Sequence, residues 1–144
     1  MKRRRFLEME TPKNKLELFS EMIHKIQEKI TLYAFILFGS RARGDAKFYS
    51  DFDIVIIGDF KMAYIERTKW VLWISPPVPI DVFCYTPEEF DKLFHSFQLT
   101  AIDAIGEGIV LYGEKFIDPY KSQYEKFLQH GMRKTSCTLI PPSL

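Results

Sequence analysis

FGSRARGDAKFYSDFDIVII, residues 38–57, is the stretch of sequence that decides the fold of this chain of 144 residues. It opens at the end of one apolar run, passes through a polar, turn-rich segment and closes in a second apolar run. Short apolar runs rich in β-formers are typical of strands that are buried on both faces of a sheet. We therefore predict strands over Tyr33–Phe38 and Asp51–Ile57. The loop that joins them, Gly39–Ser50, is predicted to contain a short helical turn after Ser40.

The rest of the chain alternates between helical and strand patterns. The first predicted helix is capped by Thr11 and packs Leu16, Phe19, Ile23, Ile26 and Ile30 against a core. After the two strands come a helix over Met62–Ile74, a strand over Ile80–Tyr85, and a helical zone that starts at Pro87, after the cap residue Thr86, and runs to about Ile105 with a break near Gln98. The chain ends with a strand over Ile109–Tyr112, a helix over Glu114–Gln129 interrupted by Pro119, and a tail over Gly131–Leu144. This order predicts an α/β (α+β) fold with a small mixed sheet flanked by helices. We expect a single domain over residues 1–144, with a core of about 12–113 and a C-terminal helix and tail over 114–144.

Composition and charge exclude several classes of protein. The chain is 47% hydrophobic and 27% charged with a net charge of +1, a balance that favours a globular protein and argues against a nucleic-acid partner. Cys84 and Cys137 suggest neither a disulfide framework nor a zinc site. The sequence shows no signal peptide and no apolar run long enough to span a membrane, so we expect a cytoplasmic protein.

Three aspartates lie at positions where the negative charge of a carboxylate needs a neighbouring positive charge. Asp51 and Asp53 lie two residues apart on one strand, so their side chains point the same way, and Asp81 lies in another apolar strand. Adjacent negative charges beside a core repel each other and lose solvation. Mg²⁺ prefers oxygen ligands and commonly binds one or two carboxylates together with substrate phosphates. If the two strands are neighbours, the three acids could hold two metal ions.

The Gly39-Ser40 pair predicts a phosphate-binding loop. Glycine lets the backbone approach a ligand closely, and a serine hydroxyl and N–H can donate to phosphate oxygens. Arg41 and Arg43 flank the pair and could neutralise a triphosphate by charge-assisted hydrogen bonds. The loop, the arginines and the acids together predict a site for a Mg²⁺-bound nucleotide.

These residues resemble the DNA polymerase β-type nucleotidyltransferase superfamily. The similarity rests on Gly39-Ser40, ten intervening residues, Asp51-Phe52-Asp53 and the later Asp81. The fuller string over residues 39–56 is similar to the minimal nucleotidyltransferase branch, whose members are often antitoxins encoded with a HEPN-domain toxin. The resemblance implies phosphate binding by Gly39 and Ser40, and metal binding and catalysis by the three aspartates. It also implies two Mg²⁺ ions and ATP as the substrate.

The resemblance leaves the acceptor open. The first interpretation is an enzyme that transfers AMP to a hydroxyl of a protein partner, which would be the HEPN toxin of a toxin–antitoxin pair. The second is an antitoxin that acts by binding alone, and the third is a small-molecule nucleotidyltransferase of the aminoglycoside kind. Because the catalytic unit takes up most of the chain, we expect an acceptor that brings its own binding surface. We also expect a homodimer or a hetero-oligomer.

Several other side chains have simpler interpretations. Asp45 is expected to be a turn residue. Asp103 and Glu107 are expected to be solvated near the end of a helical zone. Trp70 and Trp73 favour core packing, with a partner surface as the alternative, and the aromatic-rich stretch 83–97 suggests surface for association.

Overall fold

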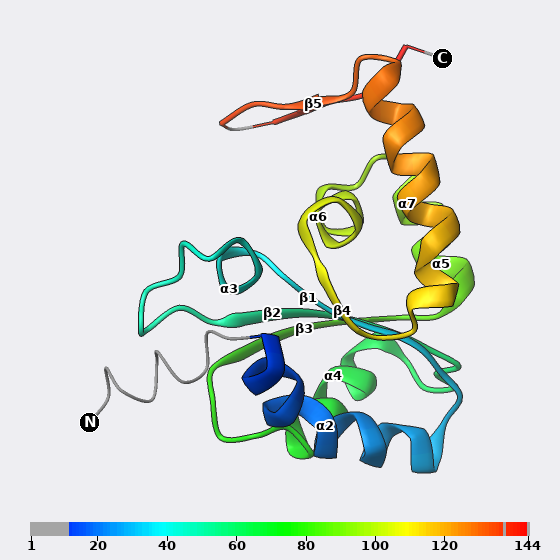
Figure 1. Cartoon of the computed structure of the whole chain (residues 1–144). Helices are drawn as coiled ribbons and strands as arrows, with labels where there is room; N and C mark the ends of the chain where they lie inside the picture. The colour runs from blue at the N-terminus through cyan, green and yellow to red at the C-terminus, as the bar shows by residue number, and fades with distance from the viewer. Residues whose placement is uncertain (1–11, 137, 144) are drawn as a thin grey trace.

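The centre of the molecule is a four-stranded mixed sheet. The structure, a computed structural model, describes residues 12–136 and 138–143. The sheet has the strand order β3-β2-β1-β4 (Figure 1). β2 and β3 are parallel, whereas β1 is antiparallel to both β2 and β4. The strands are β1 (Leu32–Phe38), β2 (Phe52–Gly58), β3 (Ile80–Tyr85) and β4 (Ile109–Tyr112).

Helices cover both faces of this sheet (Figure 1). One face carries α2 (Pro12–Lys29) and α4 (Tyr64–Trp73), and the other carries α5 (Pro87–His95), α6 (Leu99–Glu107) and α7 (Glu114–Gln129). The short helix α3 (Ser40–Arg43) lies at the end of the sheet where β1 stops. None of the helices in the described part of the chain is long and apolar enough to span a bilayer. The predicted fold class, a mixed sheet flanked by helices, is confirmed.

The two covered faces explain why β1 and β2 are apolar throughout. Phe35 and Leu37 pack into the core under α2 and α4, while Ile36 and Phe38 pack into the core on the opposite face. Successive strand side chains alternate between faces, so a strand between two helical layers needs an apolar residue at every position. Asp53 interrupts this pattern near the start of β2, and is therefore an exception that packing does not require.

The apolar stripe of α2 differs from the predicted one. Its buried side chains are those of Phe19, Met22, Ile23 and Ile26, whereas Leu16 is 45% exposed. The stripe continues backwards from Phe19 by four residues to Lys15, which is buried, rather than by three residues to Leu16. The predicted cap residue Thr11 lies outside the described residues.

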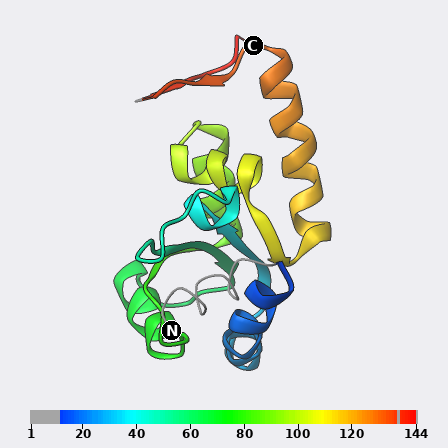
Figure 2. The same ribbon diagram turned by 60° about the vertical axis from the view of Figure 1, so that its left-hand side comes forward.

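The C-terminal part corrects two predictions. α7 runs without a break through Pro119, although proline deprives the carbonyl of Lys115 of its usual helical donor. Both residues lie on the exposed side of the helix, where water can replace that donor. The predicted tail contains a small antiparallel hairpin, β5 (Arg133–Lys134) and β6 (Leu139–Ile140), beyond the end of α7 (Figure 2).

The aromatic residues that suggested an association surface separate into two groups. Phe90 and Phe94 are fully buried between the sheet and α7, so the prediction of an apolar surface over residues 83–97 is wrong for these two rings. Trp70 is partly buried and packs edge-on against Phe60, whereas Trp73 is 88% exposed. The two tryptophans of α4 therefore have different environments.

Candidate active site

The Gly39-Ser40 loop has a backbone that few residues other than glycine can adopt. Gly39 has φ 73° and ψ −157°, and Ser40 begins α3 immediately after it. A Cβ atom at position 39 would overlap the carboxylate oxygen Oδ2 of Asp53. This close approach follows from the pairing of β1 with β2, which places Phe38 opposite Asp53. The loop and the aspartate predicted to act together are therefore in direct contact.

The carboxylates converge at one end of β2 and β3. Asp53 and Asp81 are directly opposite each other in the parallel register, and Asp51 precedes β2 by one residue. Since directly paired residues point to the same face, Asp53 and Asp81 face the same side of the sheet. Asp53 is half-buried, while Asp51 and Asp81 are exposed.

The electrostatic environment of Asp53 reflects this crowding. Burial raises its pKa above the ordinary value, and the negative charges of Asp81 and Asp51 raise it further, whereas Arg43 lowers it. The ionised carboxylate is therefore destabilised in the folded protein without a counterion. Among the described residues, no three acidic, histidine or cysteine side chains already form a metal-binding cluster. The side chains would have to adjust, or phosphate oxygens would have to complete the coordination.

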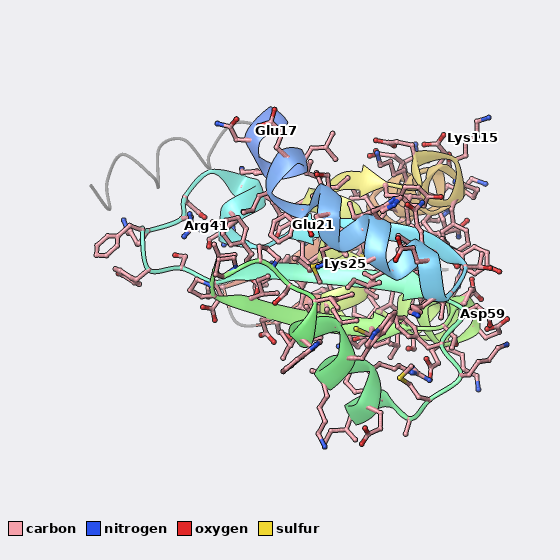
Figure 3. The ribbon with its side chains drawn as sticks, turned by 90° about the horizontal axis from the view of Figure 1, so that it is seen from below. Glu17, Glu21, Lys25, Arg41, Asp59 and Lys115 are labelled. Carbon is pink, nitrogen blue, oxygen red and sulfur yellow. The ribbon has the colours of Figure 1, made fainter. Side chains whose placement is uncertain are left out.

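Arg41 is part of the fold rather than of an open phosphate site. It is 1% exposed, and its guanidinium lies 4.5 Å from the centre of the Phe52 ring. It donates to the carbonyl oxygen of Ser50 from Nε at 3.2 Å and from Nη2 at 2.8 Å, and to that of Phe48 at 3.3 Å. The buried Lys15 donates in turn from Nζ to the carbonyl oxygen of Arg41 at 2.6 Å. Arg41 thus anchors the loop that joins α3 to β2, beside the N-terminal end of α2 in Figure 3.

Replacement of Arg41 by methionine should destabilise the protein, because the loop carbonyls would lose a charged donor. Hydrogen bonds to charged groups contribute about 1.5–3 kcal/mol. We expect the free energy of unfolding, measured by urea denaturation, to fall by about 2–3 kcal/mol. The matched control is Arg43→Met, which removes half-exposed ion pairs and should cost less than about 1 kcal/mol. Equal losses in the two variants would contradict the structural role of Arg41.

Arg43 is at the site and is held by two carboxylates. Its Nη1 lies 2.8 Å from Oε1 of Glu107, and its Nε lies 3.2 Å from Oδ2 of Asp45. These contacts raise the pKa of Arg43, with the hydrogen bond to Asp45 as the largest cause. The sequence predicts the same role for Arg41 and Arg43, but they differ in exposure: Arg41 is buried and the side chain of Arg43 is substantially exposed.

Glu107 is the residue of this site that sequence reasoning missed. It was expected to be solvated, but its side chain is 24% exposed and contacts Arg43 across 64 positions of sequence. Asp103 is likewise an ion-pair partner, at 3.0 Å from Nζ of Lys134 in β5. Neither pair has a local signal, because each joins elements that meet only in the folded chain.

Comparisons with known proteins agree with this geometry. Residues 19–111 match the family model described as the nucleotidyltransferase domain. The chain is 32% identical over 102 residues to a Methanocaldococcus jannaschii protein with the provisional name protein adenylyltransferase MJ0604; the match covers 69% of this chain and 99% of the relative.

Two solved structures share the fold. One is a provisionally assigned nucleotidyltransferase from Sulfolobus solfataricus, with 21% identity, a TM-score of 0.50, and coverage of 69% of this chain and 81% of that one. The other is a mutant of the toxin–antitoxin MntA–HpeT, with 16% identity, a TM-score of 0.51, and coverage of 80% of this chain and 87% of that one. The match over residues 19–111 includes the Gly39-Ser40 loop and the converging aspartates, so this chain belongs to the nucleotidyltransferase domain family and is a nucleotidyltransferase.

Proposed function

We propose that this nucleotidyltransferase transfers AMP from Mg²⁺-bound ATP to a hydroxyl group of a protein partner. The observation that carries the proposal is the direct pairing of Asp53 with Asp81 beside the Gly39-Ser40 loop. This arrangement presents carboxylate oxygens and a phosphate-binding loop to the same small region. The carboxylates and the loop would both be needed for an acceptor hydroxyl to attack the α-phosphorus of a nucleotide.

The residues fit magnesium. Asp51, Asp53 and Asp81 offer hard oxygen ligands, and the half-buried Asp53 lies directly opposite Asp81, an arrangement that raises the pKa of Asp53 and favours a bound cation. One or two of these carboxylates with phosphate oxygens would match the coordination that Mg²⁺ usually takes in nucleotide enzymes. When bound, the ion would supply neutralisation of charge on the phosphates and on the leaving pyrophosphate.

The protein's own groups then have distinct roles in the proposed reaction. The hydroxyl of Ser40 donates to a phosphate oxygen, and Gly39, which has no Cβ, leaves room for the carboxylate of Asp53 beside the loop. Asp81, exposed at the start of β3, accepts a hydrogen bond from the acceptor hydroxyl and orients it. Most of the rate enhancement would come from positioning and electrostatics.

A protein acceptor is supported by the relative and by the shape of the chain. The M. jannaschii relative is named for protein adenylylation, and MntA–HpeT is a toxin–antitoxin structure with the same fold. We extend this to a toxin partner, which the minimal nucleotidyltransferase resemblance suggests is of the HEPN type. α7 and the hairpin lie outside residues 19–111, the segment that the family model matches, and are available to contact such a partner.

The test uses a candidate toxin encoded by the neighbouring gene. It is incubated with ATP, Mg²⁺ and either the wild type or the Asp51→Asn/Asp53→Asn double variant. We expect intact-mass spectrometry to show the toxin gaining AMP units with the wild type alone. If the toxin gains no mass while the double variant still suppresses toxicity, the protein acts by binding and the proposed transfer is wrong.

A further inference from the structure

Arg43 is a cation beside the proposed nucleotide site, and it already forms an ion pair with Glu107. Arg43 is the last residue of α3, the short helix that begins directly after Gly39 and contacts β2. Its guanidinium is bonded to Glu107 at 2.8 Å and to Asp45 at 3.2 Å. A triphosphate that takes the Nη1 or the Nε of Arg43 must therefore replace the carboxylate that is already bound there.

The charges of the site make this competition substantial. Asp51, Asp53 and Asp81 lie at one end of β2 and β3, and Asp45 and Glu107 both contact Arg43 at the end of α3. A Mg²⁺-bound triphosphate remains an anion, so each carboxylate without a metal ion disfavours its approach. Neutralising a carboxylate that is not a metal ligand should consequently strengthen nucleotide binding.

Glu107 is the less exposed of the two carboxylates that hold Arg43, although the hydrogen bond to Asp45 raises the pKa of Arg43 more. It is 24% exposed against 62% for Asp45, and its bond to Arg43 is shorter. It ends α6 and is followed by Gly108, where a Cβ would overlap the carbonyl oxygen of Ala104. This tight packing fixes the backbone beside Glu107, whereas Asp45 lies in an exposed segment that follows α3.

We propose that Glu107 is a positioning residue that competes with the nucleotide's phosphates for Arg43 and so weakens the affinity for Mg²⁺-bound ATP. The proposal rests on the function proposed above and concerns the same site. In it, Arg43 exchanges the carboxylate of Glu107 for a phosphate oxygen when nucleotide binds. In the enzyme without nucleotide, Glu107 and Asp45 then hold Arg43 in place and neutralise its charge.

Calorimetric titration with Mg²⁺ and the α,β-methylene analogue of ATP tests the proposal, because this analogue binds without transfer. The variant Glu107→Gln should bind with a Kd about two- to fivefold lower than the wild type at low salt. The gain should shrink at high salt and disappear in the Arg43→Gln background. The matched control is Asp103→Asn, which breaks a similar ion pair one helical turn earlier on α6, with Lys134 rather than with Arg43, and should change Kd much less.

The direction in which Kd changes in Glu107→Gln shows whether Glu107 competes with the nucleotide or only supports the fold. A variant that merely loosened the fold would bind the analogue more weakly, so an unchanged or higher Kd for Glu107→Gln would overturn the proposal. A tighter Kd that persisted without Arg43 would also overturn it, since the effect would then not pass through that residue. If the wild type itself bound no nucleotide, the proposed function would fail rather than the role of Glu107.

Discussion

The Asp53→Asn variant should lose nucleotidyl transfer and yet be more stable than the wild type without metal. A metal ion contributes several kcal/mol of charge stabilisation in the transition state. Each factor of ten in rate corresponds to about 1.4 kcal/mol of activation free energy. Loss of the Asp53 carboxylate as a metal ligand should therefore lower the rate of transfer more than about a hundredfold. The variant should rise in melting temperature, because burial, Asp81 and Asp51 all disfavour the ionised carboxylate.

The pH dependence of stability gives a second measurement of the same effect. The pKa of Asp53 is raised in the folded protein, so the folded state holds its proton at pH values where the unfolded state has lost it. Stability from this group therefore falls as pH rises from the ordinary aspartate value through the raised pKa, and the full destabilisation remains above it. In metal-free buffer, the difference in melting temperature between Asp53→Asn and wild type should grow from about pH 4 towards about pH 7.

Magnesium-bound ATP should reverse the order of the two proteins. A ligand that binds the folded state raises its stability by mass action, so the wild type should gain melting temperature and the variant should gain much less. The control is Asp59→Asn, which alters an exposed ion pair with Lys61 just beyond the other end of β2 (Figure 3). Equal thermal shifts in wild type and Asp53→Asn would remove Asp53 from the nucleotide site.

Gly39→Ala should disable the site through the backbone. The combination of φ 73° and ψ −157° is essentially confined to glycine, and a non-glycine residue there costs on the order of 1–3 kcal/mol. The added methyl would also overlap Oδ2 of Asp53, so this carboxylate would have to leave its position beside the loop. We expect a lower free energy of unfolding in urea and a loss of transfer comparable to that of Asp53→Asn.

The neighbouring Gly44 separates strain from steric overlap. It also has a positive φ, of 87°, but a Cβ at this position would meet nothing within 4 Å. Gly44→Ala should therefore cost about 1–2 kcal/mol of stability from its left-handed backbone and keep most of the nucleotide affinity. If both variants kept the same activity, the contact between Gly39 and Asp53 would have no functional role.

Features that depend on neighbours in sequence were predictable. Apolar runs rich in β-formers located all four strands of this sheet; β3 and β4 have their predicted ranges, and β1 and β2 differ from theirs by no more than one residue at either end. Thr86 and Glu89 form a capping box at the start of α5, and Gln98 caps α6 where the helical zone was expected to break. Each of these signals acts within a few residues, so the sequence contains it in full.

Features that depend on how elements pack were not predictable from the sequence. The apolar stripe of α2 could be extended to Leu16 or to Lys15, and only the hydrogen bond from Lys15 to the carbonyl oxygen of Arg41 in α3 explains a buried lysine. Pro119 was predicted to interrupt a helix that in fact continues, because the affected carbonyl lies on an exposed face. Local propensity gives way in both cases to the surroundings supplied by the fold.

The sequence by itself determined the chemical inventory of the site: a glycine and a serine after one strand, and carboxylates near the starts of two others. Only the tertiary structure decided which residues meet. The register of β2 with β3 pairs Asp53 with Asp81, and Arg43 of α3 forms an ion pair with Glu107 of α6. In the folded structure Arg41 is buried and Arg43 is exposed, although both arginines flank the same loop. The physical reason is that charge interactions depend on distance and burial, which residues far apart in sequence acquire only when the chain folds.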